Sequence, residues 1–270
     1  MNAPWLMKSS RSMNFDAFKA ARKAYSYVPA RLVEVTGSGA CLVWGNLYLS
    51  PCMPLQDAWN TCAGRRQSQQ TSIKLDEYHR DLLNAEADDE ILLGLLSTVF
   101  WGYASGLNGR FTVERALSKA RQFFDGRGAI RPQARTEILR HLCKTRELLE
   151  VDRVADALRE AMKIKFLGMS FASKALMFMN PSKAAVYDRV IGERLAGSCD
   201  SKIRTLGVKQ NGARIRLSKP DIYAEWCAWC SEKATFLNHS GCQWQDWDGT
   251  LHDWRAVDVE RAFYAQPATG

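Results

Sequence analysis

Apolar residues recur every three or four positions along most of this chain, which is the spacing of one face of an α-helix. This pattern predicts helices over 14–27, 54–63, 72–85, 88–104, 112–125, 132–147, 150–163, 169–180, 188–197, 219–237 and 255–265. Residues that favour helix starts, Thr112, Asp152, Asp188 and Asp258, stand at or near four of these beginnings. We therefore expect a mainly α-helical protein.

One stretch departs from this helical pattern. Residues 31–49, RLVEVTGSGACLVWGNLYL, place Val, Leu, Trp and Tyr on both sides of a Gly37-Ser38-Gly39 turn. Such residues favour strands, and the glycines favour a reversal of the chain. The sequence therefore predicts a small β-hairpin near the N-terminus.

The length of 270 residues is sufficient for two lobes that share an interface. We expect one lobe in residues 1–100 and a second in residues 101–270, with a cleft between them. The basic stretch 198–218, which has glycines at 207 and 212, predicts a loop.

Hydropathy sets the compartment that we expect. No apolar run approaches the roughly 20 residues that cross a bilayer, and the N-terminal segment MNAPWLMKSSRSM lacks the apolar core of a signal peptide. The sequence thus predicts a cytoplasmic monomer that does not contact membranes.

Positive charge is concentrated in part of the chain. The net charge is +8, and residues 110–146 alone contain ten Lys or Arg against three Asp or Glu. Residues 158–195 and 200–219 are also basic, and the remainder of the chain is acidic. This asymmetry predicts a surface that binds a polyanion, with solvated helix surfaces as the alternative.

Lys174 is unusual in its predicted helix, because Phe, Ala, Leu and Met surround it from Phe171 to Met179. Asp188 follows shortly afterwards, at the end of the apolar run 184–187. Taken singly, Lys174 is a side chain that extends its amine to solvent, and Asp188 is a helix N-cap. Taken together, they are a desolvated amine, which favours the neutral nucleophile, and its carboxylate partner. The pattern alone leaves both interpretations open.

The segments FLGMSFASKALMF and AAVYDRV resemble the signature of the helix-hairpin-helix DNA glycosylases, most closely the 8-oxoguanine DNA glycosylase branch. In that superfamily a glycine-containing hairpin opens a helix with the catalytic lysine, and an Asp follows in a hydrophobic-Asp-x-x-hydrophobic context. Val186–Val190 supplies this context, and Phe171–Lys174 is similar to the archaeal Phe-Ala-x-Lys arrangement. Ser170 replaces the second hairpin glycine, and the lysine lies two positions later than in the bacterial endonuclease pattern.

The resemblance implies a mainly α-helical glycosylase fold, with its core and C-terminal helices in residues 101–270, that binds double-stranded DNA without a metal or other cofactor. Lys174 and Asp188 would be the catalytic residues. The segment YASGLNGRF is similar to the family's Asn-containing loop, so Asn108 would fill the gap left by an extruded base and Arg110 would lie near phosphates. The residues expected to contact the DNA backbone around the hairpin and Asp188 are Lys165, Gly168, Ser170 and Arg189.

The activity expected from the resemblance is that of a DNA N-glycosylase, with an associated lyase activity if Lys174 attacks the sugar. Its divergence from repair enzymes favours the bacterial anti-phage members that remove glucosylated hydroxymethylcytosine. An 8-oxoguanine repair enzyme and a helix-hairpin-helix DNA-binding protein without catalysis are the alternatives.

Cys227, Cys230, His239 and Cys242 have the ligand types of a zinc site and suggest a third alternative, a zinc-dependent regulator. The first two fall inside a strongly amphipathic predicted helix, which favours thiols of the hydrophobic core.

Overall fold

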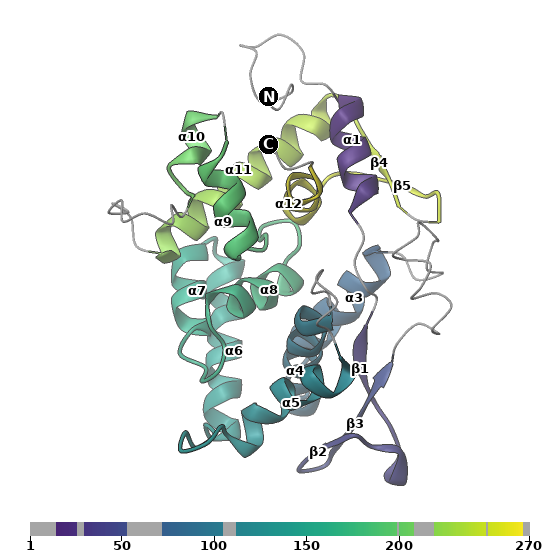
Figure 1. Ribbon diagram of the computed structural model, residues 1–270, viewed down its shortest axis with the longest axis vertical. Helices are drawn as coiled ribbons and strands as arrows, with labels where there is room; N and C mark the ends of the chain where they lie inside the picture. Colours follow the sequence, from purple (N-terminus) through teal and green to yellow (C-terminus); the bar gives the residue numbers. More distant parts are fainter. Residues whose placement is uncertain are drawn as a thin grey trace.

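Helices account for most of the residues that the structure describes, as the spacing of apolar positions predicts. The computed structural model describes residues 15–25, 30–52, 72–104, 112–198, 200–207, 219–246 and 248–266. Its helices are α1 (Phe15–Ala24), α3 (Ser72–Leu83), α4 (Asp88–Ala104), α5 (Val113–Asp125), α6 (Arg135–Glu150), α7 (Val154–Ala161), α8 (Met169–Met179), α9 (Arg189–Ala196), α10 (Ser201–Arg204), α11 (Lys219–His239) and α12 (Ala256–Ala265). Its strands are β1 (Arg31–Glu34), β2 (Leu42–Trp44), β3 (Leu47–Cys52), β4 (Trp244–Gln245) and β5 (Leu251–His252). The predicted fold class, mainly α with a small N-terminal sheet, is confirmed (Figure 1).

The predicted helix 54–63 lies outside the described residues. The prediction of a loop over 198–218 is wrong where α10 forms, because the Asp200 side chain accepts a hydrogen bond from the Lys202 backbone and caps this short helix. Ile203 then buries its side chain from the same turn. The residues 208–218 of that stretch lie outside the described ranges.

The N-terminal sheet differs from the predicted hairpin. Its strand order is β1-β3-β2, so the two strands on either side of Gly37-Ser38-Gly39 do not pair with each other. Gly37–Gly39 forms a short 3-10 helix, and the chain reverses instead at Gly45 and Asn46, between β2 and β3. Gly45 has φ +61°, a conformation that glycine adopts without the steric cost of a side chain. The predicted chain reversal at Gly37–Gly39 is therefore wrong, and the hairpin turn lies at Gly45.

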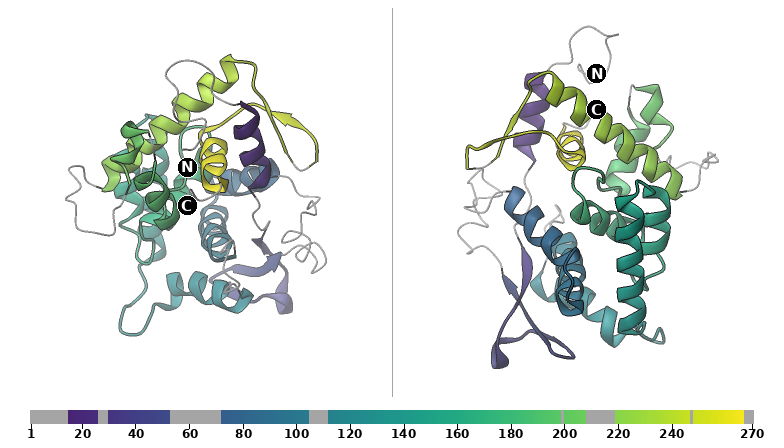
Figure 2. Two further views of the ribbon diagram at one scale, coloured as in Figure 1. Left: turned by 45° about the horizontal axis from the view of Figure 1, so that its top comes forward. Right: turned by 180° about the vertical axis from the view of Figure 1, so that it is seen from behind.

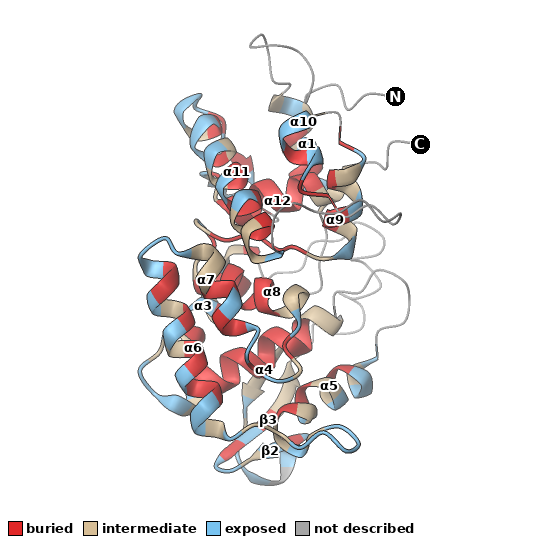
Figure 3. Cartoon of the chain, turned by 90° about the vertical axis from the view of Figure 1, so that its left-hand side faces the viewer, coloured by how far each residue is buried: buried red, intermediate tan, exposed pale blue. Residues whose placement is uncertain are grey.

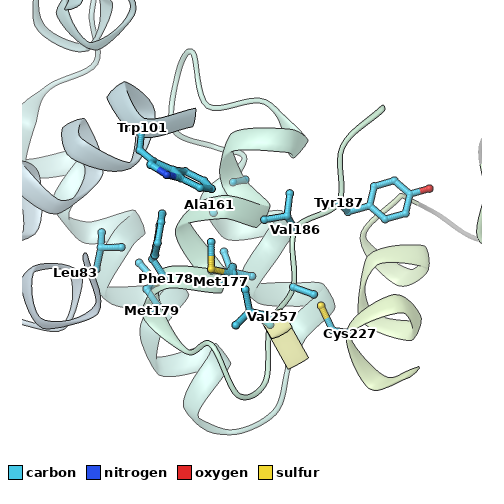
Figure 4. Close-up of a cluster of buried hydrophobic side chains, with 14 of the residues drawn as sticks. Leu83, Trp101, Ala161, Met177, Phe178, Met179, Val186, Tyr187, Cys227 and Val257 are labelled. Carbon is cyan, nitrogen blue, oxygen red and sulfur yellow. The ribbon is translucent and has the colours of Figure 1, made fainter. Parts of the chain in front are cut away.

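The core lies along α4 and α8. Every residue of α4 from Ile91 to Trp101 whose side chain is apolar is buried, and Figure 3 shows α4 as buried along most of its length. A helix that is apolar on all sides packs against neighbours on all sides, and α4 contacts α3, α5, α6, α8 and the sheet. The close-up in Figure 4 shows Trp101 of α4 beside Phe178 of α8, with Val186, Cys227 and Val257 nearby. This packing brings the helix that carries Lys174 into the middle of the molecule.

Helix α12 packs against α1, α9 and α11, and Figures 1 and 2 show it surrounded by these helices. A buried set of ion pairs, which we call the α12 ion cluster, joins α12 to α1 and α3. Its members are Arg22, Asp76, Arg255, Asp258 and Arg261. The closest contacts are 2.6 Å, from Arg255 Nη2 to Asp76 Oδ2 and from Arg261 Nη2 to Asp76 Oδ1. Residues more than 170 positions apart are thus held in direct contact.

Within the described ranges, none of the helices has both the length and the hydropathy needed to cross a lipid bilayer. The division into lobes at residue 100 and the cleft between them stay predictions.

Candidate active site

Helix α8 brings Lys174 to the end of α9. Eight consecutive residues of α8, from Ala172 to Met179, are buried. Lys174 is one of them, although its side chain carries an amine, and its relative exposure is 7%. Its Nζ lies 3.6 Å from Asp188 Oδ2 and donates to Ser170 Oγ at 3.1 Å, one helical turn earlier. The same amine lies 5.4 Å from the centre of the Phe171 ring. The side chain therefore turns to partners within the protein and does not extend to solvent.

Asp188 has two contacts that fix its orientation. It is the N-cap of α9, where Oδ1 accepts a hydrogen bond from the Ile191 backbone at 3.1 Å, while Oδ2 faces Lys174. The carboxylate is about one quarter exposed, so it is more open to solvent than Lys174. The capping role and the partner role expected of Asp188 are thus compatible and are held by different oxygens.

Ser173 holds the segment that carries Asp188 against α8. Its Oγ accepts a hydrogen bond from the Tyr187 backbone N–H at 3.0 Å and lies 3.2 Å from the Tyr187 carbonyl. Tyr187 also donates its hydroxyl to the Leu206 carbonyl, and Trp226 donates its indole N–H to the Val186 carbonyl. These bonds satisfy backbone groups of Val186 and Tyr187 and hold the residues before Asp188 against α8. Sequence reasoning missed Ser173, because its partner lies fourteen residues away.

Glu260 of α12 is a third ionisable group at this site. It is 3% exposed, and burial raises the pKa of its carboxyl to about 8, against the opposing effect of Arg261. The charge of Asp188 raises this pKa further and that of Lys174 lowers it, so Glu260 lies within electrostatic range of both. We call Lys174, Asp188 and Glu260 the active-site trio. The sequence predicts a helix over 255–265 that contains Glu260, but it does not indicate that this carboxyl is buried, because the burial results from tertiary packing.

Tyr264 stands one turn after Glu260 on the same face of α12. Burial, Asp188 and Glu260 all raise the pKa of its hydroxyl, and Arg194 of α9 lies 5.6 Å from its ring centre. Tyr264 is partly exposed and packs edge-on against Tyr25. An aromatic side chain thus borders the trio.

The turn that precedes α8 has an open helix N-terminus. Gly168 is the N-cap of α8, with an ordinary φ of −70°, and a Cβ there would have no heavy atom within 4 Å. The left-handed residue of the turn is Phe166, with φ +68°, so the reversal does not depend on Gly168. The first N–H groups of any α-helix lack intrahelical partners. The N-terminus of α8, which includes Ser170, is therefore accessible to an anion.

Basic residues surround this turn. Lys165 donates its backbone N–H to Gln133 and its Nζ to the Arg131 carbonyl, which joins the turn to the loop before α6. Tyr103 of α4 stacks on Phe171 at 4.7 Å, and Lys119 lies 5.6 Å from the Tyr103 ring. The basic segment expected to bind a polyanion is thus adjacent to the helix that carries Lys174.

Gly102 makes the approach of α4 to α8 possible. A Cβ at this position would lie 2.5 Å from Phe171 Cε1 and 3.1 Å from Lys174 Cδ. Phe171 and the stem of Lys174 therefore occupy the space that a larger residue would take.

The other predicted contacts are divided. Arg189 is the first residue of α9, is 81% exposed and pairs with Glu193 at 3.6 Å, so it lies beside Asp188 and faces solvent. Asn108 and Arg110 lie outside the described residues. Their roles, like those of Lys165, Gly168 and Ser170, stay predictions.

The four candidate zinc ligands do not form one cluster. Across the described ranges, no group of three or more His, Cys, Asp or Glu side chains is arranged to hold a metal ion. Cys227 and Cys230 are buried in α11, where burial raises the pKa of the Cys227 thiol to about 12, whereas His239 is exposed. Both cysteines are thiols of the hydrophobic core.

Residues 58–264 match the family described as "Putative 8-oxoguanine DNA glycosylase OGG-like protein". The chain belongs to this OGG-like family. The match begins well before the segments that carry the resemblance in the sequence, and it includes all three members of the active-site trio. No curated protein and no solved structure matches the chain. Membership of the family supports DNA glycosylase activity and therefore DNA as the substrate.

Proposed function

We propose that this OGG-like protein extrudes a modified base from double-stranded DNA and excises it, with Lys174 as the nucleophile. The observation that carries the proposal is the pairing of a buried lysine with Asp188 at 3.6 Å on two separate helices. A DNA-binding protein without catalysis does not need a buried amine, which is costly to bury. The same pair is the one that the sequence resemblance assigns to catalysis.

In the reaction, the Lys174 amine gives a proton to water and then forms a bond to C1′ of the sugar as the C1′–N bond breaks. The electron pair of that bond leaves with the base, and the positive charge that develops on the sugar lies near the Asp188 carboxylate. The nitrogen then loses a proton to water, the C1′–O4′ bond breaks as the sugar ring opens, and O4′ takes a proton from water. The product is a Schiff base on Nζ, from which β-elimination cleaves the strand. If Asp188 instead activates water, the base is released without strand cleavage.

DNA binding by the same face is supported by the open N-terminus of α8 and the basic residues around it. A phosphate at the N-terminus of α8 would receive hydrogen bonds from backbone N–H groups. Lys165, Arg131 and Arg189 are exposed on the elements around this position and would contact neighbouring phosphates. Asn108 would fill the gap left by the extruded base.

The base that we propose is a hypermodified phage base, glucosylated hydroxymethylcytosine, removed in defence against phage. The support is indirect: the chain departs from the repair-enzyme pattern at Ser170 and in the position of its lysine. The second candidate is 8-oxoguanine, which the description of the family favours.

The test is to incubate the protein with phage DNA that carries glucosylated hydroxymethylcytosine, with an 8-oxoguanine duplex and with unmodified DNA. We expect free base from the phage DNA and a covalent protein–DNA adduct when borohydride is present during turnover.

Lys174→Gln should lose the adduct and the strand cleavage, and Asp188→Asn should lose base release while DNA affinity stays nearly unchanged. Lys23→Gln, which makes the same substitution at an exposed residue of α1 outside the three basic stretches, is the matched control and should behave as the unaltered protein. Base release at an undiminished rate by Asp188→Asn would show that this carboxylate is only a helix cap.

A further inference from the structure

We propose that Glu260 is a third catalytic residue, the general acid that gives a proton to the base as it leaves. This inference rests on the proposed excision reaction and adds a group that the lysine–aspartate pair does not supply. A base that departs with the electron pair of the C1′–N bond is an anion unless it is protonated. A positioned acid lowers the barrier to such a departure.

The first observation is the isolation of the Glu260 carboxyl. It is buried, yet among the described residues it makes neither an ion pair nor a hydrogen bond. The positive charges of Arg261 and Arg22 act on Glu260. Arg261 is, however, paired with Asp76, and Arg22 is paired with Asp258. A buried carboxyl without a partner at contact distance is more stable with its proton than as an anion.

The second observation is the position of Glu260. Its helix, α12, packs against α9, which Asp188 caps, and is bonded to the segment that follows α8 through the Val257 N–H and the Pro181 carbonyl at 3.1 Å. The charges of both Asp188 and Lys174 act on Glu260 from these neighbouring elements. Asp188 is held as the partner of an amine and of a helix N-terminus, whereas Glu260 has neither kind of contact. A carboxyl group paired with an amine and a carboxyl group isolated by burial suit different roles, and the isolated one suits that of an acid.

Among the described residues, titratable and charged side chains from five helices and from Tyr25 surround Glu260. The titratable and charged side chains that act on it, or on which it acts, are Lys174 of α8, Asp188 of α9, Arg22 of α1, Tyr25, Tyr223, Cys227 and Cys230 of α11, and Arg261 and Tyr264 of α12. Burial raises the pKa of each of these tyrosines and of both cysteines, so they remain uncharged at neutral pH. The pKa of Glu260, about 8, lies within the range in which excision would be measured.

The proton balance is simple. Glu260 transfers its proton to a ring nitrogen or carbonyl oxygen of the departing base, which leaves neutral, and Glu260 remains as a carboxylate. The proton lost by the Lys174 nitrogen, as its bond to C1′ forms, goes to solvent water. The new carboxylate then lies near the cationic Schiff base on Nζ, and water reprotonates it before the next turnover.

An abasic site separates this role from that of Lys174. DNA that already lacks the base offers its aldehyde to Lys174 directly, so formation of the Schiff base no longer requires a leaving base or an acid. Glu260→Gln keeps the size and the polarity of the side chain but cannot donate this proton.

The experiment measures single-turnover release from whichever DNA the unaltered protein cleaves, glucosylated phage DNA or the 8-oxoguanine duplex, together with borohydride trapping on abasic DNA. We expect Glu260→Gln to slow base release by about 10²- to 10⁴-fold and to leave trapping on abasic DNA within a few-fold of normal. Base release by the unaltered protein should fall as the pH rises through about 8, and this falling limb should be absent in Glu260→Gln. Glu260→Asp, which retains an acid on a shorter side chain, should be slow but should keep the limb.

Several results would overturn the assignment. Base release by Glu260→Gln at a normal rate, or a rate for the unaltered protein that is constant from pH 7 to 9, shows that Glu260 donates no proton. Loss of abasic-site trapping together with base release shows that Glu260 only supports the structure around Lys174. If the unaltered protein neither releases base nor forms the adduct, the proposed function itself fails, and the role of Glu260 fails with it.

Discussion

Two buried groups of charges share helix α12, and they are built differently. In the α12 ion cluster, each carboxylate is contacted by arginines at 2.6 to 3.0 Å, and every member is within reach of an opposite charge. In the active-site trio, the one ion pair is 3.6 Å long, and Glu260 has no direct partner among the described residues. The first group has its electrostatic interactions satisfied within the protein. The second leaves them incomplete, as expected of side chains that act on a substrate.

The largest effect should come from breaking the satisfied group. Asp76→Ala removes the carboxylate that Arg255 and Arg261 each contact at 2.6 Å and leaves three largely buried arginines around Asp258, so the free energy of unfolding should fall by about 3–5 kcal/mol. Asp188→Asn breaks a longer and partly exposed pair, leaves Lys174 bonded to Ser170 and keeps a side chain that caps α9, so the free energy of unfolding should fall by less, about 1 kcal/mol. Denaturant titration of both variants measures the difference. An equal loss of stability in the two would show that Asp188 is also a structural charge.

A smaller effect of opposite sign should come from Glu260→Gln. The folded state raises the pKa of Glu260 to about 8 from an ordinary value of 4.5. Below pH 4.5 the carboxyl is protonated in both states; between 4.5 and 8 the unfolded chain loses the proton and the folded one keeps it, so stability falls as the pH rises. The glutamine cannot ionise, so the variant should gain up to a few kcal/mol over the unaltered protein at pH 8 and nothing near pH 4.

Thermal or denaturant unfolding at several pH values measures this gain. Glu232→Gln, at an exposed position, is the control and should show no such dependence on pH. A variant that gains stability while it loses base release would combine the two properties expected of an active-site acid. A loss of stability at pH 8 would contradict the isolation of the Glu260 carboxyl.

The smallest effect concerns the exposed charges around the trio. Binding to DNA should weaken steeply as salt increases, because Lys and Arg release counterions from the phosphates. Arg131→Glu should reduce the slope of log K against log salt by about 1, whereas Arg80→Glu, on α3, should leave it unchanged. Arg131 is the better probe than Arg135, since Arg135 is already paired with Asp89. An affinity for DNA that does not depend on salt would contradict binding through the phosphates.

The periodicity of apolar residues was sufficient to predict nearly all of the described helices, because each buries a continuous face. It could not predict the strand order, since the pairing of β1 with β3 is a contact between segments that look alike in sequence. Lys174 and Asp188 were accessible through local motifs, each within a few residues of recognisable neighbours. Glu260 was not, because its isolation results from α1, α9 and α11, whose residues lie far from it in the chain.

The bonds between Arg22 and Asp258 join residues that are separated by 236 positions. On a ribosome that adds about 5–20 residues per second, the guanidinium of Arg22 would wait at least about 12 seconds for its carboxylate. Lys174 and Asp188 would emerge before α12, and Glu260 would follow two positions after Asp258, the partner of Arg22. The nascent chain would thus hold Lys174 and Asp188 without Glu260 until α12 docks, so the three side chains come together only when synthesis is nearly finished.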